Sequence, residues 1–350
     1  MISELTQLLQ KLISIPSLSR QEDQTANVLE TFLQNKGVDT KRQGNNVWAI
    51  HPEYDPTRPT ILLNSHHDTV KANADWTRDP HAPDIEDGTL YGLGSNDAGG
   101  ALVCLIGTFL HFYPKKDLPW NLIIAATAEE EISGANGIAS ILPELGKIDL
   151  GIVGEPTEMH MAVAEKGLMV MDCVAHGKSG HAAREEGLNA IYEAIPDIEW
   201  FRTFHFPKSS DFLGPVKMSV TQIEAGTQHN VVPDACRFVV DVRTNEWYSN
   251  EEAFNIIDEA TNCTVKPRSF RLNSSRLPFE HPVVQKGNQM GRQLFGSPTL
   301  SDQALMPFAT LKMGPGDSAR SHTANEFIHL HELEEGLNIY IQLLEDLQLD

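Results

Sequence analysis

The sequence predicts an α/β fold, in which a mostly parallel sheet carries helices on both faces and a small α+β domain is inserted into the chain. Short runs that are apolar on both faces recur in its outer parts, as expected for strands buried in a parallel sheet. The four clearest runs are residues 60–65, 121–127, 149–155 and 309–314. The apolar stretch 98–112 lies between the first two runs and has the length of a covering helix.

The middle of the chain has a different pattern, typical of a separate α+β domain. Three segments alternate apolar and polar residues, which predicts strands buried on one face. They are residues 167–177, 217–226 and 236–244. Two further segments, 188–201 and 251–260, read as helices. The order strand, helix, two strands, helix is that of a ferredoxin-like domain.

The domain boundaries follow from these two patterns. A chain of 350 residues exceeds what one hydrophobic core usually serves, so a second domain or a large insertion is expected. We therefore expect residues 1–164 and 269–350 to fold together as one domain. Residues 165–268 form the inserted domain in this interpretation.

Charge and cysteine content restrict the partners and the compartment. The formal net charge of −21 repels phosphate backbones and anionic lipids, so we expect neither nucleic acid nor membrane as a partner. No 18-residue apolar run occurs, and residues 1–19 form an amphipathic pattern without the features of a secretion signal. The four cysteines include no CxxC pair and are expected to be reduced core thiols. These features predict a cytoplasmic protein.

Potential metal ligands follow the predicted strands of the main sheet. His66 follows the first strand, Glu131 the second and Glu155 the third, while His322 follows the last. In open α/β sheets, ligands bind beyond the carboxyl ends of the strands. Asp97 stands before the apolar helix. Imidazole and carboxylate are ligands that zinc, cobalt and manganese accept, so these positions predict a metal site.

Each of these residues also has an ordinary structural interpretation. The acidic triplet Glu129–Glu131 could be a solvated loop, Asp97 a helix cap and His322 a loop histidine. Their joint placement at strand ends favours the metal site, because independent surface residues would not gather there.

Five motifs resemble those of the M20 family of co-catalytic metallopeptidases and amidohydrolases, and they occur in the family's order over nearly the whole chain. They are "SHHDTV", "YGLGSNDAGG", "TAEEE", "VGEPT" and "GPGDSARSH". The resemblance implies a zinc-peptidase-like catalytic domain that binds two divalent ions, zinc or cobalt. His66 and Glu155 would hold one ion, Glu131 and His322 the other, and Asp97 would bridge them.

The same resemblance assigns roles beside the metals. Glu130 becomes the general base, Asp68 orients His66, and Glu129 supports the other two carboxylates. His67 occupies a variable position of the motif and is not expected to be a ligand. In the inserted domain, "HGKSGHAARE" points to His181 as the donor that stabilises the oxyanion.

The resemblance also implies how substrate binds. Asn230 and Arg243 would hold an α-carboxylate, with a surface ion pair to Asp241 as the alternative for Arg243. The bare backbone at Gly314 and Gly316 would approach the substrate. The inserted domain would act as a lid and join two copies into a homodimer, with His181 acting in either its own or the neighbouring subunit.

The motifs look most like the acetylornithine deacetylase branch of the family. That branch implies hydrolysis of Nα-acetylornithine or acetylcitrulline in arginine biosynthesis. Two alternatives keep the chemistry: a desuccinylase of an N-succinyl amino acid, in which Lys178, Arg184 or Arg320 could meet the distal carboxylate, and a metallo-dipeptidase or carboxypeptidase. A third is a non-catalytic protein that binds metal or an amino acid. It is disfavoured because Glu130 and His181 are both present.

Overall fold

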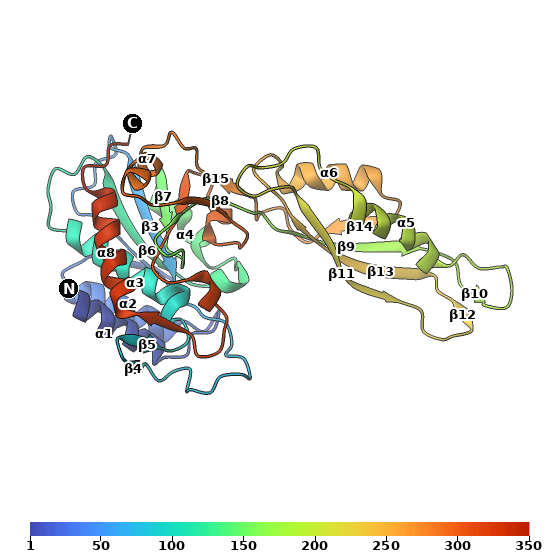
Figure 1. Cartoon of the computed structure of the whole chain (residues 1–350), viewed down its shortest axis with the longest axis horizontal. Coiled ribbons are helices and arrows are strands. Elements are labelled where there is room, and N and C mark those ends of the chain that lie inside the picture. The colour runs from blue at the N-terminus through green and yellow to red at the C-terminus, as the bar shows by residue number, and fades with distance from the viewer. Residues whose placement is uncertain (350) are drawn as a thin grey trace. The chain divides into compact units, whose positions relative to one another are not determined.

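The computed structural model describes residues 1–349 and divides into two compact units, each considered by itself (Figure 1). The first unit contains Met1–Val163, Leu277–Phe295 and the described chain from Ser301 onward. The second unit contains Ala164–Arg276 and Gly296–Leu300. It is longer than the predicted range 165–268. Ser275 and Arg276 pair with the start of this unit at Glu165 and Ala164, and Ser297 accepts the Lys166 N–H.

A twisted sheet forms the centre of the first unit, in the order β1-β2-β6-β3-β7-β17-β8. Its central strands β6, β3, β7 and β17 are parallel, whereas β1, β2 and β8 pair antiparallel at the two sides. The strands are β1 (Thr40–Gln43), β2 (Asn46–Ile50), β3 (Thr60–His66), β6 (Asn121–Thr127), β7 (Leu150–Val153), β8 (Met161–Glu165) and β17 (Thr310–Lys312). Strand β8 continues into the second unit, where it pairs with β15 (Ser275–Arg276); β16 (Leu294–Ser297) also pairs with β8.

Helices cover both faces of this sheet, as the sequence predicts for strands that are apolar on both sides. Helices α1, α3 and α8 pack together on one face, and α4 packs on the other through Ile138 and Ile141. The helices are α1 (Ile2–Ile13), α2 (Asp23–Asn35), α3 (Gly100–Phe112), α4 (Ile138–Leu145), α7 (Pro282–Gln289) and α8 (Leu330–Leu344). Among the described residues, no helix has both the length and the apolar character needed to cross a membrane.

Short elements complete the first unit and carry several residues of the site. A small sheet has the order β18-β5-β4. These elements are β4 (Ile85–Glu86), β5 (Thr89–Tyr91), β18 (Phe327–His329), η1 (Ser95–Gly99), η2 (Glu130–Ile132), η3 (Asp302–Leu305) and η4 (Ser318–Arg320). The predicted helix-cap alternative for Asp97 is wrong, because α3 begins at Gly100 and is capped at Gly99.

The second unit is a four-stranded antiparallel sheet in the order β11-β13-β9-β14, with α5 and α6 packed against it. Alternate residues of β9, such as Met169 and Cys173, face the helices and are buried with Phe238 and Ile257. The elements are β9 (Met169–His176), α5 (Ala190–Thr203), β11 (Lys217–Ala225), β13 (Ala235–Arg243), α6 (Asn250–Ala260) and β14 (Thr264–Pro267). A ribbon of β10 (Gly180–His181) and β12 (Val231–Val232) extends from one end of this unit.

The fold class predicted from the sequence is confirmed: a mixed α/β domain with a parallel centre, joined to an α+β unit. All four cysteines are buried and free, as expected. The register places the carboxyl ends of the parallel strands side by side, with His66 opposite Thr127 and Lys312 opposite Val153. This edge of the sheet is where the predicted ligands follow their strands.

Candidate metal centre

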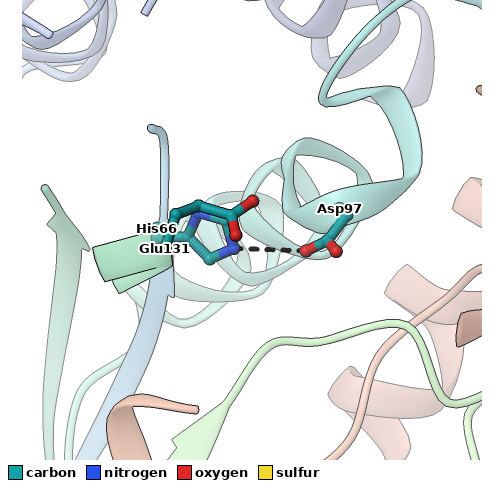
Figure 2. A group of neighbouring side chains, drawn as sticks. All are labelled: His66, Asp97 and Glu131. Carbon is teal, nitrogen blue, oxygen red and sulfur yellow. Dashed lines mark hydrogen bonds and ion pairs between the residues drawn. The ribbon is translucent and has the colours of Figure 1, made fainter. Parts of the chain in front are cut away.

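The carboxylate of Asp97 faces two histidines, as expected if it bridges two ions. Its Oδ1 lies 3.3 Å from His66 Nε2, and its Oδ2 lies 3.5 Å from His322 Nε2. Figure 2 shows the first of these contacts, with the imidazole of His66 at the end of β3 directed at Asp97 and with Glu131 close by. Two oxygens of one carboxylate therefore face two histidines that come from distant parts of the chain.

Each histidine also meets a second carboxylate. His322 Nε2 lies 3.0 Å from Glu131 Oε2, and His66 Nε2 lies 3.7 Å from Glu155 Oε1. Two ligands that share a tetrahedral ion at about 2.1 Å are separated by about 3.4 Å. The observed separations surround that value. The residues present therefore fit a pair of divalent ions, one near His66 and Glu155, the other near His322 and Glu131.

One buried atom supports this interpretation independently. Glu155 Oε1 is buried and has no hydrogen-bond partner within the described part of the chain. A buried carboxylate oxygen without a donor is costly unless a cation binds it. The orientation of His66 also suits a metal ligand, because its Nδ1 contacts the backbone carbonyl of Asp68 at 2.9 Å. A proton held there leaves the lone pair of Nε2 available for a metal.

The Asp68 side chain connects His66 to the acidic triplet. Its oxygens accept the backbone N–H groups of Glu130 at 3.1 Å and Glu131 at 3.2 Å, and the hydroxyl of Ser19 at 2.7 Å. Its Oδ1 also lies 3.4 Å from His66 Nδ1. Asp68 thus fixes the main chain of Glu130 and Glu131, in addition to facing the histidine.

The three consecutive glutamates contact different groups. Glu131 faces His322, and Glu130 Oε2 lies 3.8 Å from His66 Nε2. Glu129 has a left-handed backbone, and its carboxylate accepts both the backbone and the side-chain N–H groups of Asn136. Glu129 therefore closes its own loop, and among the described residues no hydrogen bond or ion pair joins its carboxylate to Glu130, Glu131 or the two histidines.

Burial and mutual repulsion dominate the electrostatics of this cluster. Burial raises the pKa of Glu130 well above its usual range, and Glu155, Asp302 and Glu131 add to the rise against the opposing effect of His66. Burial likewise raises the pKa of Glu155 to about 8. Bound cations would reverse this tendency, because they favour the charged form of every carboxylate around them.

His67 is a structural residue, as its place in the motif implies. Its Nδ1 contacts Thr25 Oγ1 and its Nε2 contacts the Asn45 carbonyl, both at 2.9 Å. Burial lowers the pKa of this imidazole to about 4, so it is neutral. With both nitrogens engaged, His67 has no free atom for a metal.

Gly314 and Gly316 are required by packing against neighbouring loops. A Cβ on Gly314 would lie 2.5 Å from the Glu155 carbonyl oxygen. Gly316 has a φ of +86°, and a Cβ there would lie 2.3 Å from Asn96 Oδ1. These approaches hold the 314–316 turn against the segments that carry Glu155 and Asp97. Contact of the same backbone with substrate remains a prediction.

In the second unit, two predicted residues lie together on the β10–β12 ribbon. His181 pairs with Val231, and the Ala182 N–H donates to the Asn230 carbonyl at 3.0 Å. Both His181 and Asn230 are exposed. The backbone N–H of Ala183 donates to His181 Nδ1 at 3.1 Å. A neutral His181 therefore carries its proton on Nε2, where it can be donated.

Arg243 lies at the opposite end of β13 from this ribbon. The strand begins at Ala235, and eight steps of about 3.4 Å separate that residue from Arg243 by about 27 Å. The guanidinium forms two bonds to Asp241, at 2.9 and 3.1 Å. The ion pair considered as the alternative is therefore present, and Arg243 does not join His181 and Asn230.

Three buried acidic residues near the metal centre were not singled out from the sequence. Glu326 accepts backbone N–H groups of the Asp97 segment, and Glu22 accepts the N–H of Glu129 at 3.2 Å. Asp302 accepts the hydroxyl of Thr127 at 2.9 Å. Glu326 lies in the sequence "NEF", four residues after His322, and this closeness to a predicted ligand could have drawn attention to it. Glu22 and Asp302 lie outside the five motifs.

The fold and the site together define a metal-dependent hydrolase that acts on amide bonds, and two divalent ions fit its ligands. The chain belongs to peptidase family M20/M25/M40, whose sequence profile matches residues 62–346.

Curated relatives of similar length include succinyl-diaminopimelate desuccinylases. The enzyme of Wolbachia pipientis wMel is 25% identical over 368 residues, covering 97% of this chain and 92% of the relative. The enzyme of Buchnera aphidicola from Cinara cedri is 26% identical, covering 98% of both chains. The predicted membership of the family is confirmed, whereas these relatives do not belong to its acetylornithine deacetylase branch.

Solved structures show the same fold. An aminopeptidase from Bacillus cereus superposes with a TM-score of 0.77 at 19% identity, covering 99% of this chain and 98% of that one. A dinuclear metal-binding peptidase of the M20 family from Bacillus subtilis gives a TM-score of 0.72 at 18% identity, covering 98% and 97%.

Proposed function

We propose that the enzyme hydrolyses the amide bond between an acyl group and an amino acid, and that an N-succinyl amino acid is the first substrate to test. The observation that carries the proposal is the carboxylate of Asp97, which faces His66 and His322 with its two oxygens. Glu131 and Glu155 complete the proposed ligand set.

Glu130 is proposed to move the proton. When bound, the two ions polarise the scissile carbonyl and make water at the site more acidic. The Glu130 carboxylate accepts a proton from the attacking water and delivers it to the leaving amine. Its position supports this role, because it lies beside His66 while its backbone N–H is held by Asp68.

His181 is proposed to donate a hydrogen bond to the oxyanion of the tetrahedral intermediate. The N–H of Ala183 occupies Nδ1, which leaves the proton on Nε2 and supports this role. Asn230 is beside His181 on the same ribbon and is proposed to contact the substrate.

We propose a homodimer in which these roles are divided between subunits. A separation of about 27 Å along β13 prevents Asn230 and Arg243 of one chain from binding the same small carboxylate. One subunit would supply His181 and Asn230, and the other would supply Arg243. The edge strand β11 and the exposed Tyr192 and Ile195 of α5 offer a surface for such pairing.

The acyl group is the least constrained part of the proposal. The desuccinylase relatives favour a succinyl group, which was the alternative reading of the motifs. Arg320 is engaged with Glu332 at 2.7 Å. The guanidinium of Arg184 is exposed and lies 3.9 Å from the exposed carboxylate of Glu186, and the backbone N–H of Arg184 donates to the His181 carbonyl. Arg184 is therefore our candidate for the distal carboxylate of a succinyl group.

An N-acetyl substrate, acetylornithine or acetylcitrulline, is the second candidate, and it rests on the motif resemblance. A role in arginine biosynthesis follows only in that case. Parallel rates on N-succinyl and N-acetyl forms of diaminopimelate, ornithine and citrulline distinguish the two. We expect the succinyl series to give higher kcat/KM, and Arg184→Gln to reduce that advantage. A higher kcat/KM for the acetyl series would contradict the succinyl assignment.

A further inference from the structure

Glu326 is a buried glutamate whose carboxylate binds the main chain beside the proposed bridging ligand. The residue is only 1% exposed. Its Oε1 accepts the backbone N–H of Asn96 at 2.8 Å and that of Asp97 at 2.9 Å. A buried carboxylate needs such donors, and these two come from the turn that carries Asp97.

The same loop supplies another proposed ligand. His322 lies four residues before Glu326, and the Glu326 carbonyl accepts the Gly92 N–H at 3.0 Å. Asn325, between them, accepts the backbone N–H groups of Thr77 and Arg78 at 3.1 Å. The loop is thus attached to residues 77 and 78 as well as to the segment that leads into the turn, so the position of Glu326 does not depend on the turn alone.

The Asp97 turn has a second attachment through the side chain of Asn96. Its Nδ2 donates to the Asp317 carbonyl and its Oδ1 accepts the Asp317 N–H, both at 3.1 Å. The side chain of Asn96 and the backbone N–H groups of the turn are therefore bound by the same 317–326 region. Without Glu326, two adjacent buried N–H groups would lose their acceptor.

We propose that Glu326 is a positioning residue that sets the main chain of Asp97, so that the two carboxylate oxygens face His66 and His322 together. This inference rests on the proposed ligand set. Glu326 is not a member of that set, and its proposed role is to hold Asp97 where its carboxylate can reach both ions. Partners that orient metal ligands typically contribute 10–100-fold to metal affinity.

The test compares Glu326→Ala, Glu326→Asp and Glu326→Gln in the full-length protein. Zinc affinity at both sites is measured by competition with a chromogenic chelator, and the melting temperature of each metal-free variant is recorded. Ala removes the acceptor and Asp withdraws it by one methylene, whereas Gln keeps a carbonyl oxygen at the same reach. We expect affinity to fall about 10–100-fold for Ala, less for Asp, and within about threefold for Gln.

Glu246→Ala is the control, because Glu246 is a glutamate of the second unit whose side chain is 8% exposed, pairs with Arg276 and accepts the Ser210 hydroxyl. It should lower the melting temperature without changing zinc affinity. If Glu326→Ala does not fold, the Asp and Gln variants decide. Wild-type affinity in Glu326→Asp, or equal losses in Asp and Gln, would overturn the positioning role.

Asp97→Ala separates this inference from the ligand assignment on which it depends. Loss of zinc in Asp97→Ala with unchanged affinity in the Glu326 variants refutes the inference alone. Unchanged affinity in Asp97→Ala refutes the proposed ligand set.

Discussion

Replacing Glu129, Glu130 and Glu131 by Gln, one at a time, should give three different results from the same substitution. Each change removes one negative charge and keeps the size of the side chain. Glu130→Gln should stop turnover and retain both ions, because an amide cannot accept the proton of water. Glu131→Gln should weaken the ion near His322, and Glu129→Gln should affect stability only.

The magnitudes follow from the contacts of each residue. A general base contributes roughly 10²–10⁴-fold, so kcat of Glu130→Gln should fall by that factor. Glu131 Oε2 lies 3.0 Å from His322 Nε2, and its loss removes a proposed ligand. Glu129 accepts two N–H groups from Asn136, and an amide can replace only one acceptor. Loss of one such bond costs about 1–3 kcal/mol of unfolding free energy.

The assay needs three readouts on each variant: kcat, the number of ions retained after gel filtration, and the unfolding midpoint. Glu129→Gln is the internal control, since its kcat should stay within about threefold while its midpoint falls. Wild-type kcat in Glu130→Gln, or a lost ion in that variant with none lost in Glu131→Gln, would show that base and ligand were exchanged.

Three further predictions concern the ions and the assembly. Chelation should abolish turnover and lower the melting temperature, and zinc at about 100 Kd should restore about 2.7 kcal/mol of stability; unchanged activity after complete metal removal contradicts this. Metal binding should release protons at pH 7 and few above pH 9, and metal affinity should rise over that interval. The reason is that the Glu131 hydrogen bond raises the pKa of His322 to about 9 and burial raises that of Glu155 to about 8, and both groups must lose a proton to bind metal. Calorimetry in buffers of different ionisation enthalpy measures the number of protons released, and a number that does not change with pH contradicts the prediction. Mixed Glu130→Gln and His181→Ala proteins should recover activity if His181 acts in the neighbouring subunit, whereas no recovery after proven subunit exchange places His181 in its own chain.

Strands and their ends were readable in the sequence because the burial pattern sets them. The run at 121–127 became β6 without a change of boundary, and the run at 60–65 became β3 with one more residue, His66. Residues at the ends of adjacent parallel strands meet at one sheet edge, so His66 and the acidic triplet could be brought together without coordinates.

The residues that sequence reasoning missed act through the main chain or across long separations. Glu22 binds the N–H of Glu129 from 107 positions away, and Asp302 binds Thr127 from 175 positions away. Neither contact leaves a periodic pattern or a local motif. The position of Arg243 at the far end of β13 from the ribbon also required the strand register, since Asn230 and Arg243 are only 13 positions apart in the sequence.

Contacts between carboxylates and backbone N–H groups explain how the chain holds mutually repelling carboxylates near one another. Asp68 accepts the N–H groups of Glu130 and Glu131, and Glu326 accepts that of Asp97. Two carboxylates that bind no ion in this proposal, Asp68 and Glu326, therefore hold the main chain of the proposed base and of two proposed ligands. An N–H bond fixes a loop even when the ligand charges are uncompensated, so part of the site geometry is set before metal arrives. The ions then have to supply charge compensation, and less of their binding free energy is spent on ordering the loops.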